Sequence, residues 1–470
     1  MLLGAPCMTH LGMTVRAVWM GLFGLAVGCG SNASPQTPDA ASAIDAAVAH
    51  DAPPIDAPPG LLTMAERAAI GMQSPLPAVP ADPTNAHADD PLAAKLGQML
   101  FFDKSYAGAL VVGDSGSNGG LGAVGDTGKV SCASCHAVGT GTLDDERSTP
   151  GNVSLGIKFG TRNALGLVNS AYYKWSNWGG KFDSQWSLPL AVAENASTMA
   201  SNRLQIVHAL YAKYRTAYNA TFATPLDPSL DPTAADASRF PATGHPGDAA
   251  GFDGMAAADK VIVNTIYANY GKALQAYVRK LVSADAPFDR FVAGDDHAIS
   301  ASAVRGLKLF LAKKCATCHA GPAFTDNQFH ALAVPQSGAN VPATDTGRFT
   351  DVAAVLASPF NTGGAFSDNT TTGKLTGVAQ DAAQTGQFRT KGLRNVATSA
   401  PYMHAGQLAT LGDVISFYNA GGGTAPTGVT KDPLMVPLAL SAGEQADLVE
   451  FLGTLTGQPI NAALEIDTSK

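Results

Sequence analysis

Two short motifs place a pair of cysteines and a histidine at a spacing that suits the attachment of a porphyrin. The residues concerned, in the first motif and then the second, are Cys132, Cys135 and His136, followed by Cys315, Cys318 and His319. Two thiols three positions apart can each add to one vinyl group of a single haem, and the histidine that follows can bind its iron. The sequence therefore predicts two covalently attached haem c groups.

Other uses of a Cys-x-x-Cys pair fit these motifs less well. A structural zinc site would need two further ligands close by, and neither motif has an obvious second pair. A thioredoxin-like dithiol would follow a strand in a βαβ unit, and the sequence around the motifs does not read as one. With six cysteines and ten histidines in 470 residues, random placement would give far fewer than one such motif. We conclude that the two motifs are not accidental.

Length and composition limit the kind of protein and its partners. The chain has 470 residues, so two or three hydrophobic cores are expected. Apolar residues make up 46% of the chain, which is ample for such cores, and 50 glycines with 29 prolines indicate many loops. The net charge of -8 argues against a nucleic-acid partner, because phosphate binding favours a basic face.

The N-terminal segment is typical of an exported protein. Residues 13–28 hold one arginine and then an apolar run too short to cross a membrane, and Cys29 follows in a lipobox-like context. We expect residues 1–29 to be a signal peptide that leaves a lipid anchor on Cys29; an ordinary signal peptide with an incidental cysteine is the alternative. Residues 30–90 are expected to be a disordered linker, because the part up to residue 61 is rich in Ala, Asp and Pro. The expected location is the periplasm or cell envelope, with the membrane reached only through that anchor.

Helical periodicity prevails in the rest of the chain, and the alternation typical of strands is scarce. Val261–Val282 has apolar residues at helical spacing and is expected to close a first domain. Ala301–Ala312 is expected to open a second domain with a helix that runs into the second motif. We therefore predict a mainly α fold with long loops and two cytochrome c-like haem domains, at residues 91–285 and 286–470.

Four further stretches match the pattern of a known family. They are residues 96–103 (LGQMLFFD), 306–310 (GLKLF), 324–326 (FTD) and 386–404 (GQFRT through LRN to APYMH). On these stretches the chain resembles the di-haem cytochrome c peroxidase family, and within it the branch that contains MauG- and MbnH-like enzymes. The resemblance runs from about residue 92 to residue 457, which is nearly all of the part of the chain expected to be ordered.

The resemblance implies a division of labour between the two haems. In this family peroxide reacts at the N-terminal haem, and the C-terminal haem stores or relays an electron. Residues 91–285 would then form the peroxidatic domain and residues 286–470 the electron-transfer domain. Trp178 matches a tryptophan that lies between the haems and relays electrons; core packing is the alternative role for this side chain.

The resemblance also suggests how each iron is ligated. Tyr418 matches the position of the sixth ligand of the second haem, and Met403 is the alternative ligand. The sequence between His136 and Asn163 contains no histidine, so the first haem is expected to be five-coordinate and open to peroxide. His330 is expected to be a structural histidine beside the second haem.

Two further sets of residues match family positions. Asn163, Ser399 and Pro401 match a calcium site between the haems, and oxygen ligands of this kind suit Ca²⁺. The family also places a glutamine and a glutamate over the first haem as peroxide-activating groups. One register offers Gln185 and Glu194 for these roles.

A second register, aligned on Trp178, Trp186 and Arg203, places Leu188 and Thr198 there instead. In that register no carboxylate would stand over the first haem.

The predicted function is that of a di-haem peroxidase that reduces hydrogen peroxide. The electrons would come from a small donor protein, either a cytochrome c or a cupredoxin, or from an aromatic residue of a protein substrate, as in MauG-like chemistry. The alternatives are an electron-transfer cytochrome without peroxide turnover and a di-haem oxygenase. An open first haem favours the enzyme, because an electron carrier gains from six-coordinate iron that excludes ligands.

Overall fold

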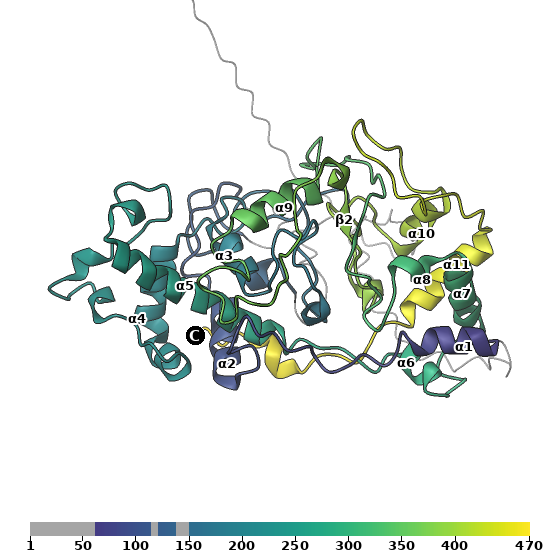
Figure 1. Ribbon diagram of the computed structural model, residues 1–470, viewed down its shortest axis with the longest axis horizontal. Coiled ribbons are helices and arrows are strands. Elements are labelled where there is room, and N and C mark those ends of the chain that lie inside the picture. The colour runs from purple at the N-terminus through teal and green to yellow at the C-terminus, as the bar shows by residue number, and fades with distance from the viewer. Residues whose placement is uncertain (1–61, 114–120, 138–149) are drawn as a thin grey trace, which may run out of the picture. The chain divides into compact units, whose positions relative to one another are not determined.

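The computed structural model describes residues 62–113, 121–137 and 150–470 (Figure 1). The expected signal peptide, Cys29 and the linker as far as residue 61 lie outside these ranges. The described residues belong to one compact unit. None of their helices has the length and apolar character that a membrane crossing needs.

Helices dominate the described part of the chain, which confirms the prediction of a mainly α fold. The only regular strands there, β1 and β2, are two residues long and pair antiparallel, Phe329 with Arg389 and His330 with Phe388. The α-helices are α1 (Met64–Gly71), α2 (Pro91–Phe102), α3 (Ser187–Glu194), α4 (Arg203–Thr221), α5 (Ala257–Val278), α6 (Pro287–Val292), α7 (Ala301–Ala312), α8 (Cys315–Cys318), α9 (Arg348–Ala357), α10 (Leu411–Asn419) and α11 (Ala442–Gly453). The helices predicted from periodicity correspond to α5 and α7.

The prediction of a disordered linker is wrong for residues 62–90. Helix α1 begins with a capping box, in which the Thr63 hydroxyl accepts a hydrogen bond from the Glu66 N–H and the Glu66 carboxylate accepts one from the Thr63 N–H. Leu62 and Ile70 are 6% and 1% exposed and pack into the core formed by α7 and α11. The prediction rested on the average composition of the segment. An average does not reveal that a few apolar residues pack against helices that are far away in the sequence.

Two helix pairs form the frame of the molecule, one in each half of the described chain. Helix α2 packs on α5, and α7 packs on α11. Figure 1 shows the first pair beside α3 and α4, and the second pair beside α8 and α10. Each pair lies in its own hydrophobic cluster, one centred on Trp186 and Tyr267 and the other on Phe310 and Phe451. The domain boundary at residues 285 and 286 stays a prediction.

The two pairs cross in the same way, each through a glycine. A Cβ atom on Gly97 of α2 would lie 2.0 Å from the Ala273 carbonyl oxygen of α5 and 3.0 Å from the Cβ of Tyr277. A Cβ atom on Gly306 of α7 would lie 1.9 Å from the Asp447 carbonyl oxygen of α11 and 2.9 Å from the Cβ of Phe451. Only glycine lets the backbones approach this closely. Each crossing therefore fixes the helix that precedes a Cys-x-x-Cys-His motif.

We predict that Gly306→Ala destabilises the protein by about 1–3 kcal/mol, because α7 and α11 must separate to admit a methyl group. The matched control is Gly443→Ala in α11, where an added Cβ meets nothing within 4 Å, and where alanine should stabilise the helix by about 0.5 kcal/mol. Urea denaturation followed by circular dichroism measures both changes. Equal stability of the two variants would contradict the close crossing.

Candidate functional site

The first motif opens onto a cavity of about 470 Å³, called here the first cavity. Cys132, Cys135 and His136 line it together with apolar side chains from three helices. Those side chains are Phe101 of α2, Leu188 and Val192 of α3, and Leu274 and Val278 of α5. Apolar walls of this kind hold a porphyrin and keep water away from its iron.

The second motif opens onto a cavity of about 520 Å³, called here the second cavity. Helix α8 starts after Lys314, whose φ of 62° turns the chain directly out of α7. Cys315, Cys318 and His319 line the cavity with Phe310 of α7, Ile415 and Tyr418 of α10, and Leu448 and Leu452 of α11.

The cysteines and histidines of both motifs fit a covalently bound haem. All four cysteines are free thiols rather than disulfides, and burial raises the pKa of Cys132 to about 12 and of Cys315 to about 11. The Nδ1 atom of His319 lies 3.1 Å from the Phe324 carbonyl oxygen, which leaves Nε2 for iron. Burial lowers the pKa of His136 to about 4, so its imidazole is neutral and its lone pair is available to a metal.

Trp178 stands between the two cavities. Its indole lines the second cavity, and the preceding residues Ser176 and Asn177 line the first. The indole N–H donates to the Asn163 carbonyl oxygen at 2.8 Å, which fixes the ring. The relay role of Trp178 stays a prediction.

Comparison with known proteins identifies the family. Residues 91–297 match the family described as di-haem cytochrome c peroxidase. The chain is 32% identical to the cytochrome-c peroxidase IdrP1 of Denitromonas iodatirespirans, over 81% of this chain and 85% of that protein. The chain belongs to the di-haem cytochrome c peroxidase family. The residues that line the two cavities are therefore haem-binding candidates in a peroxidase.

Two other similarities support the same family and fold. The methylamine utilization protein MauG of Methylorubrum extorquens is 26% identical to the chain, with 78% of this chain and 79% of that protein covered. The crystal structure of a MauG-like protein associated with microbial copper homeostasis has a TM-score of 0.54 and 23% identity, covering 84% of this chain and 99% of that one. The latter supports the fold alone.

Both candidates for the sixth ligand of the second haem line the second cavity. The Tyr418 hydroxyl has no hydrogen bond with any residue in the described ranges, and burial, with the thiols of the second motif nearby, raises the pKa of this tyrosine. Met403, whose backbone φ is 71°, lines the same cavity. The choice between the two ligands stays a prediction.

Two of the three predicted calcium ligands, Asn163 and Pro401, lie beside Gly406. Asn163 is 4% exposed, and neither its side-chain oxygen nor its side-chain nitrogen has a hydrogen-bond partner in the described structure. A Cβ atom on Gly406 would lie 2.6 Å from the Asn163 Nδ2 and 3.2 Å from the Pro401 Cγ. The Ser399 hydroxyl donates to the Val396 carbonyl oxygen at 3.0 Å, which leaves the Ser399 carbonyl as its free oxygen.

A buried amide with two unpaired atoms is costly unless a ligand satisfies it. The unpaired side chain of Asn163 therefore fits a cation held by oxygen atoms.

Glu194 does not stand over the first haem site. It is the last residue of α3, and its carboxylate accepts hydrogen bonds from the Arg203 main-chain N–H at 3.0 Å and from the Arg203 guanidinium at 2.9 Å. The carboxylate thus caps the N-terminus of α4 and does not line the first cavity. This placement argues against the predicted acid–base role, because the carboxylate is already committed to a buried arginine.

Gln185 does line the first cavity, where its side-chain amide donates to the Ser170 hydroxyl at 3.0 Å. Leu188 and Thr198, the residues of the second register, also line this cavity. Among the residues that line the cavity, Asp351 is the one carboxylate, and it is paired with Arg162 at 2.7 Å.

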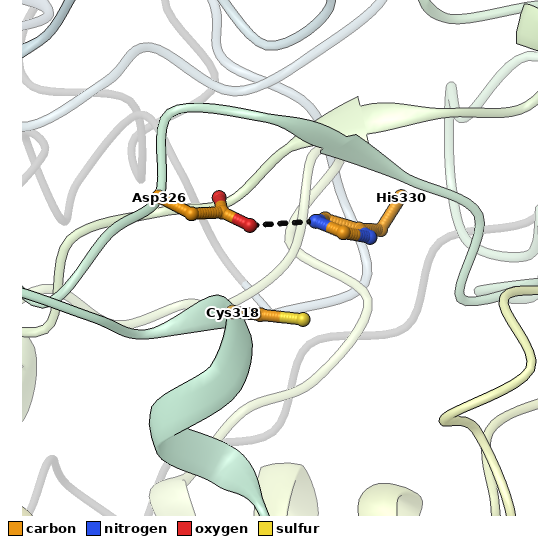
Figure 2. A group of neighbouring side chains, drawn as sticks. All are labelled: Cys318, Asp326 and His330. Carbon is orange, nitrogen blue, oxygen red and sulfur yellow. Dashed lines mark hydrogen bonds and ion pairs between the residues drawn. The ribbon is translucent and has the colours of Figure 1, made fainter.

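His330 lies beside the second motif and is held by two carboxylates. Its Nε2 lies 2.9 Å from Asp326 and its Nδ1 lies 2.7 Å from Asp432, and Figure 2 shows the first of these pairs next to Cys318. Cys318, Asp326 and His330 lie close enough together to hold a metal ion. Since the Cys318 thiol is needed for the thioether link to haem, we interpret His330 as a structural residue that ties β1 to the wall of the second cavity.

Sequence reasoning missed two basic residues near Trp178, the buried Arg389 and the half-buried Lys391. Arg389 lines both cavities and Lys391 lines the second. The signal in the sequence is the spacing of basic residues in the stretch after Gly386.

We predict that Glu194→Gln lowers the free energy of unfolding by about 2–3 kcal/mol, because the buried Arg203 guanidinium loses its counter-charge. The rate of reaction of the di-haem protein with peroxide should stay within about twofold of the unaltered protein, since less than about 0.5 kcal/mol of barrier is affected. Stopped-flow absorbance and urea denaturation measure the two effects. A large loss of peroxide reactivity without loss of stability would restore Glu194 as the acid–base group.

Proposed function

We propose that this di-haem peroxidase accepts hydrogen peroxide at the first cavity and passes oxidising equivalents through Trp178 to the second cavity. Two motif-lined cavities on either side of one indole are the observation that carries the proposal. The haem groups, when bound, supply the redox centres through which donor electrons reach peroxide. An aromatic side chain between two such centres divides one long electron transfer into two shorter ones.

The chain's own residues account for the first half of the reaction. Leu188 and Val192 exclude bulk water from the first cavity, and Gln185 offers an oriented amide that can position a peroxide oxygen. Glu194 is not available to move a proton between the two peroxide oxygens. We therefore infer that proton transfer, rather than access, limits peroxide reduction in this protein.

At the second cavity, we infer that Tyr418 rather than Met403 is the sixth ligand. Its hydroxyl lacks a hydrogen-bond partner among the described residues of the second cavity, so its oxygen is available to bind a metal. Tyrosine oxygen stabilises oxidised iron better than a thioether does. This ligand would place the protein on the MauG-like side of the family.

The proposed cation site is Ca²⁺ held by the Asn163 side-chain oxygen and the carbonyl oxygens of Ser399 and Pro401. Since the Asn163 carbonyl accepts the Trp178 indole N–H, a cation here would also stiffen the support of the relay residue.

The electron source is proposed to be a small donor protein, a cytochrome c or a cupredoxin, or an aromatic residue of a protein substrate. Slow proton transfer at the first cavity suits the second kind of donor, because oxidising equivalents must then persist until a large partner docks. The proposed location is the periplasm or cell envelope, with a lipid anchor at Cys29.

A plain electron-transfer cytochrome is the second candidate. The observation that favours it is the commitment of Glu194 to Arg203, which leaves the first cavity without a free carboxylate.

The test compares the unaltered di-haem protein with Tyr418→Phe and Met403→Leu. The unaltered protein should consume peroxide in the presence of a reduced small cytochrome and show a low-spin second haem at rest. Tyr418→Phe removes only the hydroxyl, so it should lose most of the low-spin signal and slow peroxide consumption several-fold. Met403→Leu should leave both unchanged. Electron paramagnetic resonance and peroxide assays provide the measurements.

The reverse pattern, with the low-spin signal lost only in Met403→Leu, would assign the ligand to Met403. No peroxide consumption by the unaltered protein would favour the electron carrier.

For the cation site, we predict that a chelator lowers the melting temperature of the unaltered protein and that added Ca²⁺ restores it. A ligand at about 1,000 times its dissociation constant contributes about 4 kcal/mol to stability. Asn163→Leu should melt at the lower temperature with or without chelator. Asn340→Leu is the control, because Asn340 is an exposed asparagine; it should respond to the chelator as the unaltered protein does. A melting temperature that ignores the chelator would rule out the site.

A further inference from the structure

Lys391 places a positive charge between the two cavities. It follows β2 and lines the second cavity, and its ammonium nitrogen lies 5.9 Å from the centre of the Trp178 ring. The same nitrogen lies 5.3 Å from the centre of the Tyr173 ring, which lines the first cavity. One ammonium group therefore lies over an aromatic ring of each cavity.

This ammonium group lacks a counter-charge within the described part of the chain. The Lys391 ammonium has neither an ion pair nor a hydrogen bond there, whereas the buried guanidinium groups of Arg162, Arg203 and Arg394 are each paired with a carboxylate. Arg389, two residues earlier, adds a second cation at 4.0 Å from the Tyr173 ring centre. Burial and the charge of Arg389 lower the pKa of Lys391 to about 7. This shift is expected when no carboxylate offsets the repulsion between the two cations.

The neutral and oxidised forms of Trp178 respond to this charge in opposite ways. The face of a neutral indole attracts a cation. Loss of one electron makes the indole positive, and the ammonium then repels it. At about 6 Å in a medium of effective dielectric constant about 20, the interaction of two unit charges is several times the thermal energy.

The oxidised indole also keeps its proton. Its N–H donates to the Asn163 carbonyl oxygen at 2.8 Å, and a peptide carbonyl is not a base at neutral pH. The oxidised ring is therefore a radical cation, and the Lys391 ammonium repels it whenever that side chain is protonated, which it mostly is below pH 7.

We propose that Lys391 is a positioning residue that makes Trp178 harder to oxidise, so that Trp178 passes oxidising equivalents between the cavities without storing them. In the underlying reaction, hydrogen peroxide takes two electrons and two protons and leaves as two molecules of water. Trp178 gives one electron to the redox centre that has lost one and regains one from the other centre or from the donor. The inference rests on the relay role of Trp178 in the proposed function. It adds that the charge of Lys391 limits the lifetime of the oxidised indole.

The test uses the complete di-haem protein with Lys391→Met, which keeps the length of the side chain but not its charge. Lys391→Arg is the matched control, and all variants are measured below pH 7, where both the lysine and the arginine carry a positive charge. Midpoint potentials of both irons are measured by spectroelectrochemistry, without peroxide. Electron paramagnetic resonance after one equivalent of peroxide measures the radical on Trp178, with Trp178→Phe as the blank, and peptide mass spectrometry measures oxygen added to Trp178.

Lys391→Met should lower both midpoint potentials, because a positive charge near each iron is lost, and should raise the yield of Trp178 radical and of oxygenated Trp178 several-fold. Lys391→Arg should match the unaltered protein in all three. Removal of an unpaired buried charge should also leave the melting temperature unchanged or higher.

Two results would overturn the inference. Unshifted midpoint potentials in Lys391→Met, especially with a lower melting temperature, would mean that a haem carboxylate neutralises the ammonium. Shifted potentials with an unchanged Trp178 radical yield would mean that the charge does not govern the indole. If the unaltered protein does not react with peroxide at all, the proposed function fails. If Lys391→Met then forms no Trp178 radical either, the role of Trp178 on which the inference depends is also refuted.

Discussion

The close crossing of two helix pairs is the constraint on which the rest of the structure depends. Gly97 and Gly306 bring α2 against α5 and α7 against α11 at distances that a side chain would not allow. Each crossing places one aromatic residue, Phe101 or Phe310, on the wall of a cavity that a Cys-x-x-Cys-His motif also lines. The apolar space for a porphyrin therefore follows from backbone packing, and the motif adds the covalent link.

The region between the cavities has a different physical character. Cations lie against aromatic rings there: Arg389 and Lys391 against Tyr173, and Lys391 against Trp178. Neither cation has a carboxylate partner in the described structure. Such charges are costly in an apolar interior. A fixed positive charge raises the reduction potential of every redox group near it. Such an effect on the two redox sites would explain why these costly charges are present between them.

The sequence predicted those features that depend on local spacing. The two motifs and the helices at α5 and α7 could be found, because a thiol pair or a helical period is contained in a few consecutive residues. The role of Glu194 could not, because two registers differ by several residues and only the fold shows the carboxylate bound to Arg203. The unpaired charge of Lys391 was invisible for the same reason: a lysine in a sequence carries no sign of its burial or of its neighbours.

The two cavities differ in the polar groups that line them. The first has several amides, Gln185 among them, and its one lining carboxylate, Asp351, is paired with Arg162. The second is lined by Tyr418, whose hydroxyl has no hydrogen-bond partner among the described residues, and a phenol oxygen suits oxidised iron. Under the proposed function, an enzyme built in this way would gain little speed at the peroxide step, and its oxidised state would last longer afterwards. We infer that such an enzyme suits a slow encounter with a protein donor better than the rapid removal of peroxide.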